Sequence, residues 1–308
     1  MTTQTQAPTS FGVGLGYGLA AYIMWGGFPL YFMLVDDLPL LTVVASRVLF
    51  ALMLLSLIIA ISRKWHDVSA LMRDRRALRM SVIAGVILVV NWSIYVYAVT
   101  SGHVIDASLG YFMNPLMTVL LAVLVVHERL RRSQWVALAL AAIGVAIITV
   151  ALGALPIIGL SLALTFAVYG LIRKSIPGTA TASLFVETLG ATPVALIYFA
   201  FTWTTFQQTG DIPHAVLLLA VAGPVTVLPL LAFGGAVNRL PLSVVGMLQY
   251  TTPTLIFLLG LLLFNETVVV GEWLGFIFIW IALIVFTTAS LNKARRRPLT
   301  DASEAHIA

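Results

Sequence analysis

Two ionisable side chains interrupt long apolar stretches of the sequence. Arg47 lies in VASRVLF and Glu187 lies in LFVETLG. Charged groups are costly in an apolar environment, so they mark functional sites by default. We expect Arg47 to bind an anionic group of a solute and Glu187 to take up or release a coupling proton, because burial disfavours the charged form of a carboxyl group. The alternatives are a structural ion pair, or an Arg47 side chain that extends to the membrane surface.

Polar and aromatic residues gather around two prolines in other apolar stretches. Pro115 and Pro253 each lack a backbone N–H and free the carbonyl four residues earlier, at Tyr111 and Gln249. Inside a membrane such a carbonyl must face protein or a watery cavity. We therefore predict a solute site with aromatic walls, and an ordinary helix kink is the alternative. The candidate substrate-binding residues are Arg47, Asn91, Trp92, Tyr95, Tyr111, Asn114, Gln249 and Tyr250.

The composition identifies the elements that must carry these residues. The 308 residues are 60% hydrophobic and 9% charged, whereas about 25% of residues are charged in soluble domains. Apolar runs long enough to cross a bilayer recur along the chain, which predicts an all-α polytopic membrane protein with ten transmembrane helices. We interpret the first run as a helix rather than a cleaved signal. The ten predicted segments are 11–34, 40–61, 80–100, 107–126, 135–152, 155–172, 183–203, 214–235, 243–264 and 272–290.

Positive charge is concentrated in alternate loops. Sixteen of the 17 Lys and Arg residues lie in the tail or in four predicted loops, which are 62–79, 127–134, 173–182 and 236–242. The positive-inside rule places these segments and both termini in the cytoplasm. The net charge of +5 therefore follows from topology and requires no nucleic-acid partner.

One phrase of the sequence occurs twice. The two copies are NPLMTVLLAVLVVHERLRRSQW (114–135) and TPTLIFLLGLLLFNETVVVGEW (252–273). They share a proline, a glutamate and a tryptophan at one constant offset, but only the first copy has arginines after its glutamate. We expect these glutamates, Glu128 and Glu266, to cap or brace the turn to the next helix.

The missing arginines indicate that the second copy is inverted in the membrane. Five predicted helices separate equivalent positions, so the two glutamates lie on opposite sides, and arginine belongs only on the cytoplasmic side. We predict two inverted five-helix repeats followed by a basic cytoplasmic tail. The predicted boundaries are 11–152 for the first repeat, 153–290 for the second and 291–308 for the tail.

Inverted repeats are a recurrent architecture of secondary transporters, which bind their solute between the two halves. We therefore predict a carrier of small organic solutes that works by alternating access and is coupled to an ion or a proton. A channel or a non-transporting membrane scaffold is the alternative. The sequence has no cysteine, no P-loop pattern and no His or Asp cluster at a predicted membrane face, so we expect neither an enzyme nor a bound metal or cofactor.

The expected partners are the solute and membrane lipid. Overlapping G-x-x-x-G pairs between Gly12 and Gly18 allow close helix packing, either within the fold or in a homodimer.

Several stretches resemble a known family of carriers. The spacing P-x12-E-x6-W is similar to that of the EamA branch of the drug/metabolite transporter superfamily. The stretches NWSIYVYAV (91–99), ASLGYFMNPL (107–116), FVETLGATPVALIY (185–198) and LPLSVVGMLQYTTPTLIFLLGLLLFNE (240–266) resemble its RarD-like, chloramphenicol-sensitive permeases. The resemblance covers residues 11 to 290. It implies a carrier in the inner cell membrane for a small organic solute, and it indicates no particular substrate.

Overall fold

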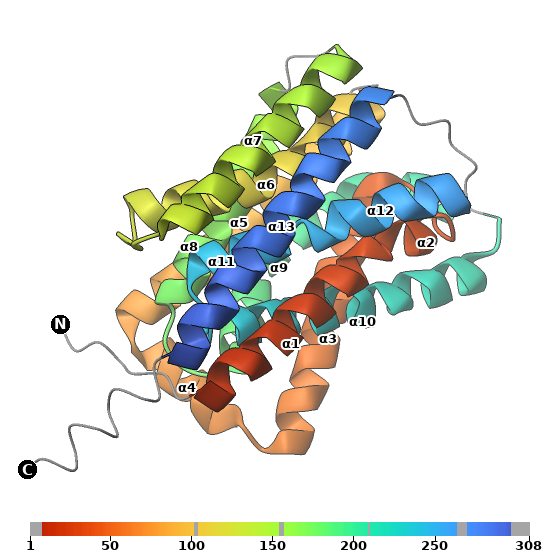
Figure 1. Cartoon of the computed structure of the whole chain (residues 1–308). Helices are drawn as coiled ribbons and strands as arrows, with labels where there is room; N and C mark the ends of the chain where they lie inside the picture. The colour runs from red at the N-terminus through yellow and green to blue at the C-terminus, as the bar shows by residue number, and fades with distance from the viewer. Residues whose placement is uncertain (1–7, 102–103, 154–156, 209, 264–269, 297–308) are drawn as a thin grey trace, which may run out of the picture.

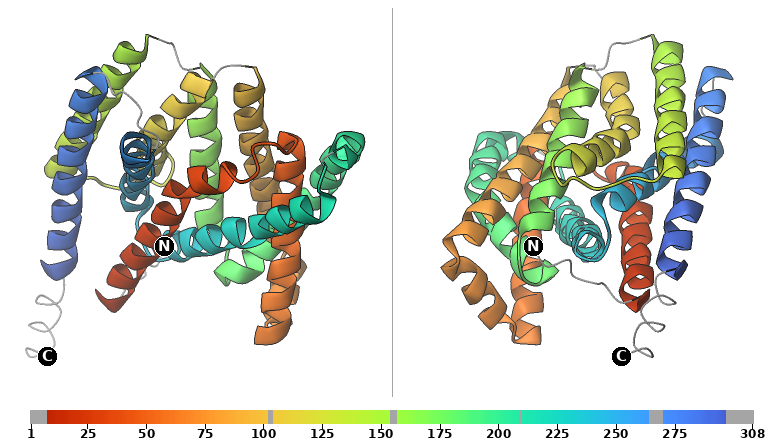
Figure 2. Two further views of the ribbon diagram at one scale, coloured as in Figure 1. Left: turned by 90° about the vertical axis from the view of Figure 1, so that its right-hand side faces the viewer. Right: turned by 60° about the vertical axis from the view of Figure 1, so that its left-hand side comes forward.

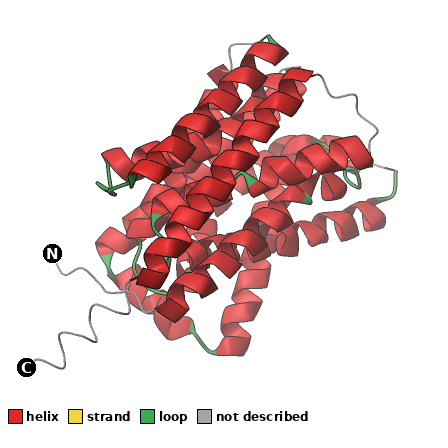
Figure 3. Cartoon of the chain, in the orientation of Figure 1, coloured by secondary structure: helices red, strands yellow, loops and turns green. Residues whose placement is uncertain are grey.

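The computed structural model describes residues 8–101, 104–153, 157–208, 210–263 and 270–296. Within these ranges the regular elements are all α-helices (Figure 3). The helices are α1 (Pro8–Gly26), α2 (Phe28–Phe32), α3 (Leu40–Ser62), α4 (Trp65–Arg73), α5 (Arg75–Thr100), α6 (Val104–Leu124), α7 (Arg132–Leu152), α8 (Ile157–Ser175), α9 (Ala180–Gln207), α10 (Ile212–Val237), α11 (Leu242–Leu248), α12 (Thr251–Leu262) and α13 (Val270–Arg296).

These helices match the predicted apolar segments in order. Seven apolar stretches of the described chain are long enough to cross a membrane, and shorter apolar helices cover Gly110–Leu124 and Trp273–Ala289. The predicted break between the fifth and sixth segments is confirmed, because α7 ends at Leu152 and Gly153 follows in the left-handed conformation at φ 69°. The chain therefore has the predicted all-α polytopic fold.

Three segments differ from the prediction. The first apolar segment is divided at Gly26–Gly27 and continues as the short helix α2. The predicted loop 62–79 contains α4, which forms a helix because Val68 and Leu71 are buried on one of its faces. Arg173 is not in a loop but in the last turn of α8, where it is 1% exposed. Its positive charge suggested a loop, but a buried partner allows it to lie inside the bundle.

Polar caps fix the starts of two helices in the second half. The Thr179 side chain accepts a hydrogen bond from the amide of Ala182 at the start of α9. The Asp211 carboxylate accepts one from the amide of His214 at the start of α10, at 3.0 Å. Side-chain oxygens at this position satisfy backbone N–H groups that have no partner within the helix.

The first and the last described helices meet the same end of the bundle. α1 begins and α13 ends there, and α4 and the last turn of α3 lie at the same end of the bundle (Figures 1 and 2). We call this the terminal end. Since the chain crosses the bundle with each long helix, α3 runs toward the terminal end and α9 runs away from it.

The helix packing is almost unchanged when the two halves of the chain are exchanged. The contacts of α1 with α10 and of α3 with α10 correspond to those of α8 with α5 and of α9 with α5. The contact of α1 with α12 corresponds to that of α8 with α6. The pairs α3–α9, α6–α11 and α7–α13 map onto themselves, and Figure 1 shows α7 and α13 side by side. This is the pattern of two five-helix repeats related by a two-fold axis.

Candidate solute and coupling sites

Arg47 lies in the half of the bundle away from the terminal end. It is the eighth of the 23 residues of α3, about 10 Å from the start of that helix at 1.5 Å per residue. Its side chain is 7% exposed, and its Nε donates a hydrogen bond to Thr226 Oγ1 of α10 at 3.1 Å. The guanidinium carbon lies 4.0 Å from the centre of the Trp92 ring and 5.4 Å from that of Phe28. These rings contribute a cation–π attraction to the arginine.

Three tyrosines complete this environment. Tyr31, Tyr95 and Tyr111 all lie close enough to Arg47 to interact with it electrostatically. The rings of Tyr95 and Tyr111 meet edge to face, with their centres 6.3 Å apart. Five helices thus converge here, namely α2, α3, α5, α6 and α10. We call Arg47, Phe28, Tyr31, Trp92, Tyr95, Tyr111 and Thr226 the Arg47 site. Among the described residues, Arg47 forms no ion pair.

Glu187 lies in the half of the bundle toward the terminal end. It is the eighth of the 28 residues of α9 and is 1% exposed. Its Oε1 accepts a hydrogen bond from Arg173 Nη1 at 2.8 Å, and its Oε2 accepts one from the Tyr169 hydroxyl at 3.1 Å. Arg173 also donates to the Ser183 hydroxyl and, at 3.0 Å, to the carbonyl of Ala180. We call Tyr169, Arg173, Ser183 and Glu187 the paired site.

Arg47 and Glu187 therefore do not form an ion pair with each other. Each is the eighth residue of its helix, but α3 and α9 run in opposite directions, so the two side chains lie in opposite halves of the bundle. Glu187 has Arg173 as its partner, and Arg47 has Thr226 and aromatic rings. The alternative, a structural ion pair, applies to Glu187. Its partner is Arg173, which the sequence had placed in a loop.

A third polar group lies where α11 meets α12. The helix tightens there, since the amides of Gln249 and Tyr250 bond three residues back at 3.1 and 3.2 Å. The Thr118 hydroxyl of α6 donates to Gln249 Oε1 at 3.2 Å. Two buried polar atoms, Asn114 Oδ1 and the Tyr250 hydroxyl, have no hydrogen-bond partner among the described residues.

The two prolines act differently on their helices. α6 continues through Pro115 to Leu124, so this proline removes one hydrogen bond without ending the helix. The corresponding segment of the second half is divided at Gln249–Tyr250, three residues before Pro253. The division falls at Gln249, whose carbonyl loses its usual helical hydrogen bond because Pro253 has no backbone N–H.

Asn91 is occupied by packing between helices. Its Nδ2 donates to the carbonyl of Leu162 at 2.9 Å and to Thr165 Oγ1 at 2.8 Å. Both partners belong to α8. Asn91 therefore joins α5 to α8, and its neighbour Trp92 is the residue that contacts Arg47.

An aromatic cluster connects the α11–α12 junction with the paired site. Thr252 of α12 donates to the carbonyl of Tyr22 at 2.9 Å. The Tyr22 ring lies 5.5 Å from that of Trp25, which lies 5.7 Å from Phe233. Phe233 stacks on Tyr169 of the paired site at 5.8 Å.

The sequence reasoning missed Arg173 and Thr226. Arg173 carried a usable signal, because Tyr169–Arg173 and Ser183–Glu187 are both spaced by four residues and therefore share a helix face. Thr226 carried none, since nothing distinguishes it from the other hydroxyl residues of the apolar helices.

Glu128 does not brace the turn to the next helix as expected. Its carboxylate accepts hydrogen bonds from the amides of Leu242 at 2.6 Å and Ser243 at 3.0 Å, at the start of α11. Lys174 Nζ donates to the carbonyl of Leu240 at 2.7 Å in the same region. A glutamate of the first half thus holds a helix of the second half at the terminal end. The matching residue Glu266 lies outside the described residues.

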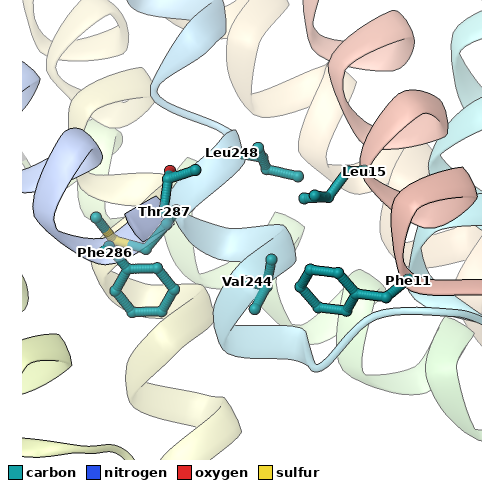
Figure 4. A pocket seen from close by; sticks show the side chains of 7 residues that line it. Phe11, Leu15, Val244, Leu248, Phe286 and Thr287 are labelled. Atoms are coloured by element: carbon teal, nitrogen blue, oxygen red, sulfur yellow. The ribbon is translucent and has the colours of Figure 1, made fainter. Parts of the chain in front are cut away.

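A small crevice between α1, α11 and α13 is apolar. Figure 4 shows its lining, which consists of Phe11, Leu15, Val244, Met247, Leu248, Phe286 and Thr287. Thr287 supplies its only hydroxyl group. The crevice does not include any of the predicted solute-binding residues.

Comparison with known proteins shows the family. The EamA-like transporter family matches residues 12–150. An uncharacterized transporter of Vibrio cholerae is 40% identical over 92% of this chain and 95% of its own length. Protein RarD of Streptomyces exfoliatus is 40% identical over 92% of this chain and 90% of its own length, and protein RarD of Escherichia coli is 38% identical over 92% and 96%.

A solved crystal structure has the same fold. It superposes with a TM-score of 0.69 at 17% sequence identity, and the match covers 95% of this chain and 100% of the other. The fold, the repeat and these relatives agree, and the chain belongs to the EamA-like transporter family, with RarD proteins among its relatives.

Proposed function

We propose that this membrane protein is a secondary-active transporter that moves small organic solutes by alternating access. The supporting observation is the helix packing, which is retained when the two halves are exchanged. Two related halves in different surroundings can swap conformations, which opens a shared site to one side and then to the other. The proposed halves are residues 11–152 and 153–290.

The Arg47 site is the proposed binding site. Arg47, Trp92, Tyr95 and Tyr111 contact the solute, while Asn91 holds Trp92 in place through α8. The proposed path continues to Asn114, Gln249 and Tyr250 beside the tightened turn between α11 and α12. Asn114 Oδ1 and the Tyr250 hydroxyl have no hydrogen-bond partner in the described part of the chain. A buried polar atom without a partner is costly, and a passing solute or water would satisfy it.

Glu187 is the proposed coupling residue. In its charged form it neutralises Arg173 and joins α8 to α9. A proton on its carboxylate would leave Arg173 as an uncompensated buried cation, which favours a different arrangement of these helices. The protonation of one carboxyl group would thereby bias the equilibrium between the two conformations.

The test of coupling uses one double variant in which both members of the ion pair are replaced. In Arg173→Gln with Glu187→Gln, neutral amides replace both charges, so the fold loses the titratable group without gaining an unpaired charge. Small molecules in the medium are compared between cells overproducing the wild type and this double variant. We expect a compound to accumulate outside only with the wild type, while solute exchange across vesicles persists in the variant. Wild-type rate and pH dependence in the variant would contradict the role of Glu187.

We also propose that the terminal end faces the cytoplasm. The chain has no cysteine, so single cysteines can report the side of the membrane. Ala70 on α4 and Ser101 after α5 are both exposed and lie at opposite ends of α5. We expect a membrane-impermeant thiol reagent to label Ser101→Cys in intact cells and Ala70→Cys only after lysis. Labelling of both from one side would rule out this topology.

A channel is the alternative function. A transporter shows saturable exchange that a solute on the opposite side accelerates, whereas a channel does not. The same vesicle experiment therefore separates the two.

A further inference from the structure

We infer that the Arg47 site selects aromatic monocarboxylates, meaning a flat aromatic ring that carries one carboxylate and no ammonium group. This inference rests on the proposed function, which makes Arg47 a solute-binding residue. It adds the chemical class of the solute.

The unused donors of Arg47 point to a carboxylate. A guanidinium has five N–H donors, and Nε is occupied by Thr226. The two terminal nitrogens form a planar fork that matches the two oxygens of a carboxylate. The described residues provide no carboxylate for this fork. A solute carboxylate would supply both the missing acceptors and the missing negative charge.

Arg173 shows how this protein neutralises a buried arginine, although its Nε has no hydrogen-bond partner among the described residues. Its guanidinium has the Glu187 carboxylate, the Ser183 hydroxyl and the Ala180 carbonyl as acceptors. Breaking or omitting the partner of a buried charge is strongly unfavourable. Both arginines are buried, at 7% and 1% exposure, and they differ in that only Arg173 has a carboxylate partner among the described residues.

The surrounding rings indicate the rest of the solute. Trp92 and Phe28 lie against the guanidinium, and Tyr95 and Tyr111 extend the aromatic wall onto α6. A ring bound here would make edge-to-face and offset contacts with several side chains. Such a wall favours a flat ring over a branched aliphatic group.

The charges nearby limit the solute to one negative group. Sixteen of the 17 Lys and Arg residues lie in a loop, in the tail or at a helix end at the terminal end, and Arg47 is the exception. A phosphate dianion would therefore keep an excess charge in the site. An amino acid would bring an ammonium group for which the described residues around Arg47 hold no carboxylate. Both classes should bind more weakly than an uncharged ring with one carboxylate.

Benzoate is the probe that tests this class. Its binding to the purified full-length protein is measured by tryptophan fluorescence and by the shift in unfolding temperature. The competitors are benzamide, which lacks the charge, acetate, which lacks the ring, phenylalanine, which adds an ammonium, and phenyl phosphate, which adds a second charge. We expect benzoate to bind at least about tenfold more tightly than each of them, since charge-assisted bidentate hydrogen bonds are the strong ones.

Three arginine variants assign the binding to Arg47. Arg47→Gln should weaken benzoate binding about tenfold or more. Arg239→Gln is the matched control, because Arg239 also lies over an aromatic ring, 5.1 Å from the centre of Tyr17, but at the terminal end. It should bind benzoate as the wild type does. Arg47→Lys keeps the charge without the fork and should show an intermediate loss, which provides a second test if Arg47→Gln does not purify.

The inference is overturned if benzoate and benzamide bind equally well to the wild type, or if Arg47→Gln and Arg47→Lys both bind benzoate at wild-type strength. A failure of the proposed function gives a different result. In that case benzoate binding depends on Arg47, but preloaded vesicles show no benzoate exchange.

Discussion

Arg47 and Arg173 are both buried in the helix bundle, but among the described residues only Arg173 has a carboxylate partner. Arg173 has a glutamate, a serine hydroxyl and a backbone carbonyl as acceptors. Arg47 has one threonine hydroxyl and two aromatic faces. The first arrangement joins neighbouring helices α8 and α9, and the second lies where five helices converge.

The contrast separates two uses of a buried charge. A neutralised pair can change state only by gaining or losing a proton, so it suits coupling. A buried cation without a carboxylate partner can change state by binding an anionic ligand, so it suits recognition. The two-fold relation between the halves sets Arg47 and Glu187 at matching positions of their helices. The repeats thus share a backbone plan and differ in the chemistry at that position.

The largest effect is expected from breaking the pair on one side. Glu187→Gln leaves Arg173 charged and buried without a carboxylate, and we expect the free energy of unfolding to fall by about 3–5 kcal/mol. Unfolding in mixed micelles measures this change. Adding Arg173→Gln should recover most of the loss. If the single variant were as stable as the wild type, Arg173 would have to be solvated or otherwise paired.

A smaller effect is expected from crowding the paired site. A β-carbon at Gly85 on α5 would collide with the backbone carbonyl of Glu187 on α9. We expect Gly85→Ala to cost about 1–3 kcal/mol through overpacking. Gly12→Ala is the control, since nothing lies within 4 Å of an added β-carbon there. Equal stabilities of the two variants would show that α5 and α9 can move apart freely.

Glu128 stabilises the terminal end by a further contact between the halves. Glu128→Gln keeps the shape but removes the charge that accepts from the amides of Leu242 and Ser243. We expect a loss of about 1 kcal/mol, as for other caps of helix N-termini. Asp211→Asn changes a cap within the second half in the same way and should cost less, because asparagine also caps well. The same unfolding assay compares the two, and a larger loss for Asp211→Asn would contradict the assignment.

The smallest change in stability is expected at Arg47. Arg47→Gln removes cation–π contacts worth about 0.5–2 kcal/mol, but it also removes a buried cation that has no carboxylate in the described structure. These effects oppose each other, so we expect a net change within about 1 kcal/mol. Benzoate should stabilise the wild type and leave the variant unchanged. A loss of stability as large as that of Glu187→Gln would show that Arg47 is a structural cation. The two buried arginines would then not differ in role.

Much of the fold could be read from the sequence because the relevant signals are local. Apolar runs of membrane-spanning length, basic residues in alternate loops and a phrase repeated five helices later indicated the helix order and the inverted repeat. The Gly153 break was visible for the same reason. The candidate residues Arg47, Trp92, Tyr95 and Tyr111 lie close together although they belong to three different helices, and their role in solute binding stays a prediction.

The partners of the charged groups were decided only by the tertiary structure. Hydropathy and charge describe one residue at a time, so Arg173 was assigned to a loop and was not recognised as the partner of Glu187. Their pairing depends on which faces of α8 and α9 meet, and the contact of Glu128 with α11 spans more than a hundred residues. The partner available to a charge inside a membrane depends on which helices pack against it, and those neighbours are set by the packing of the whole bundle.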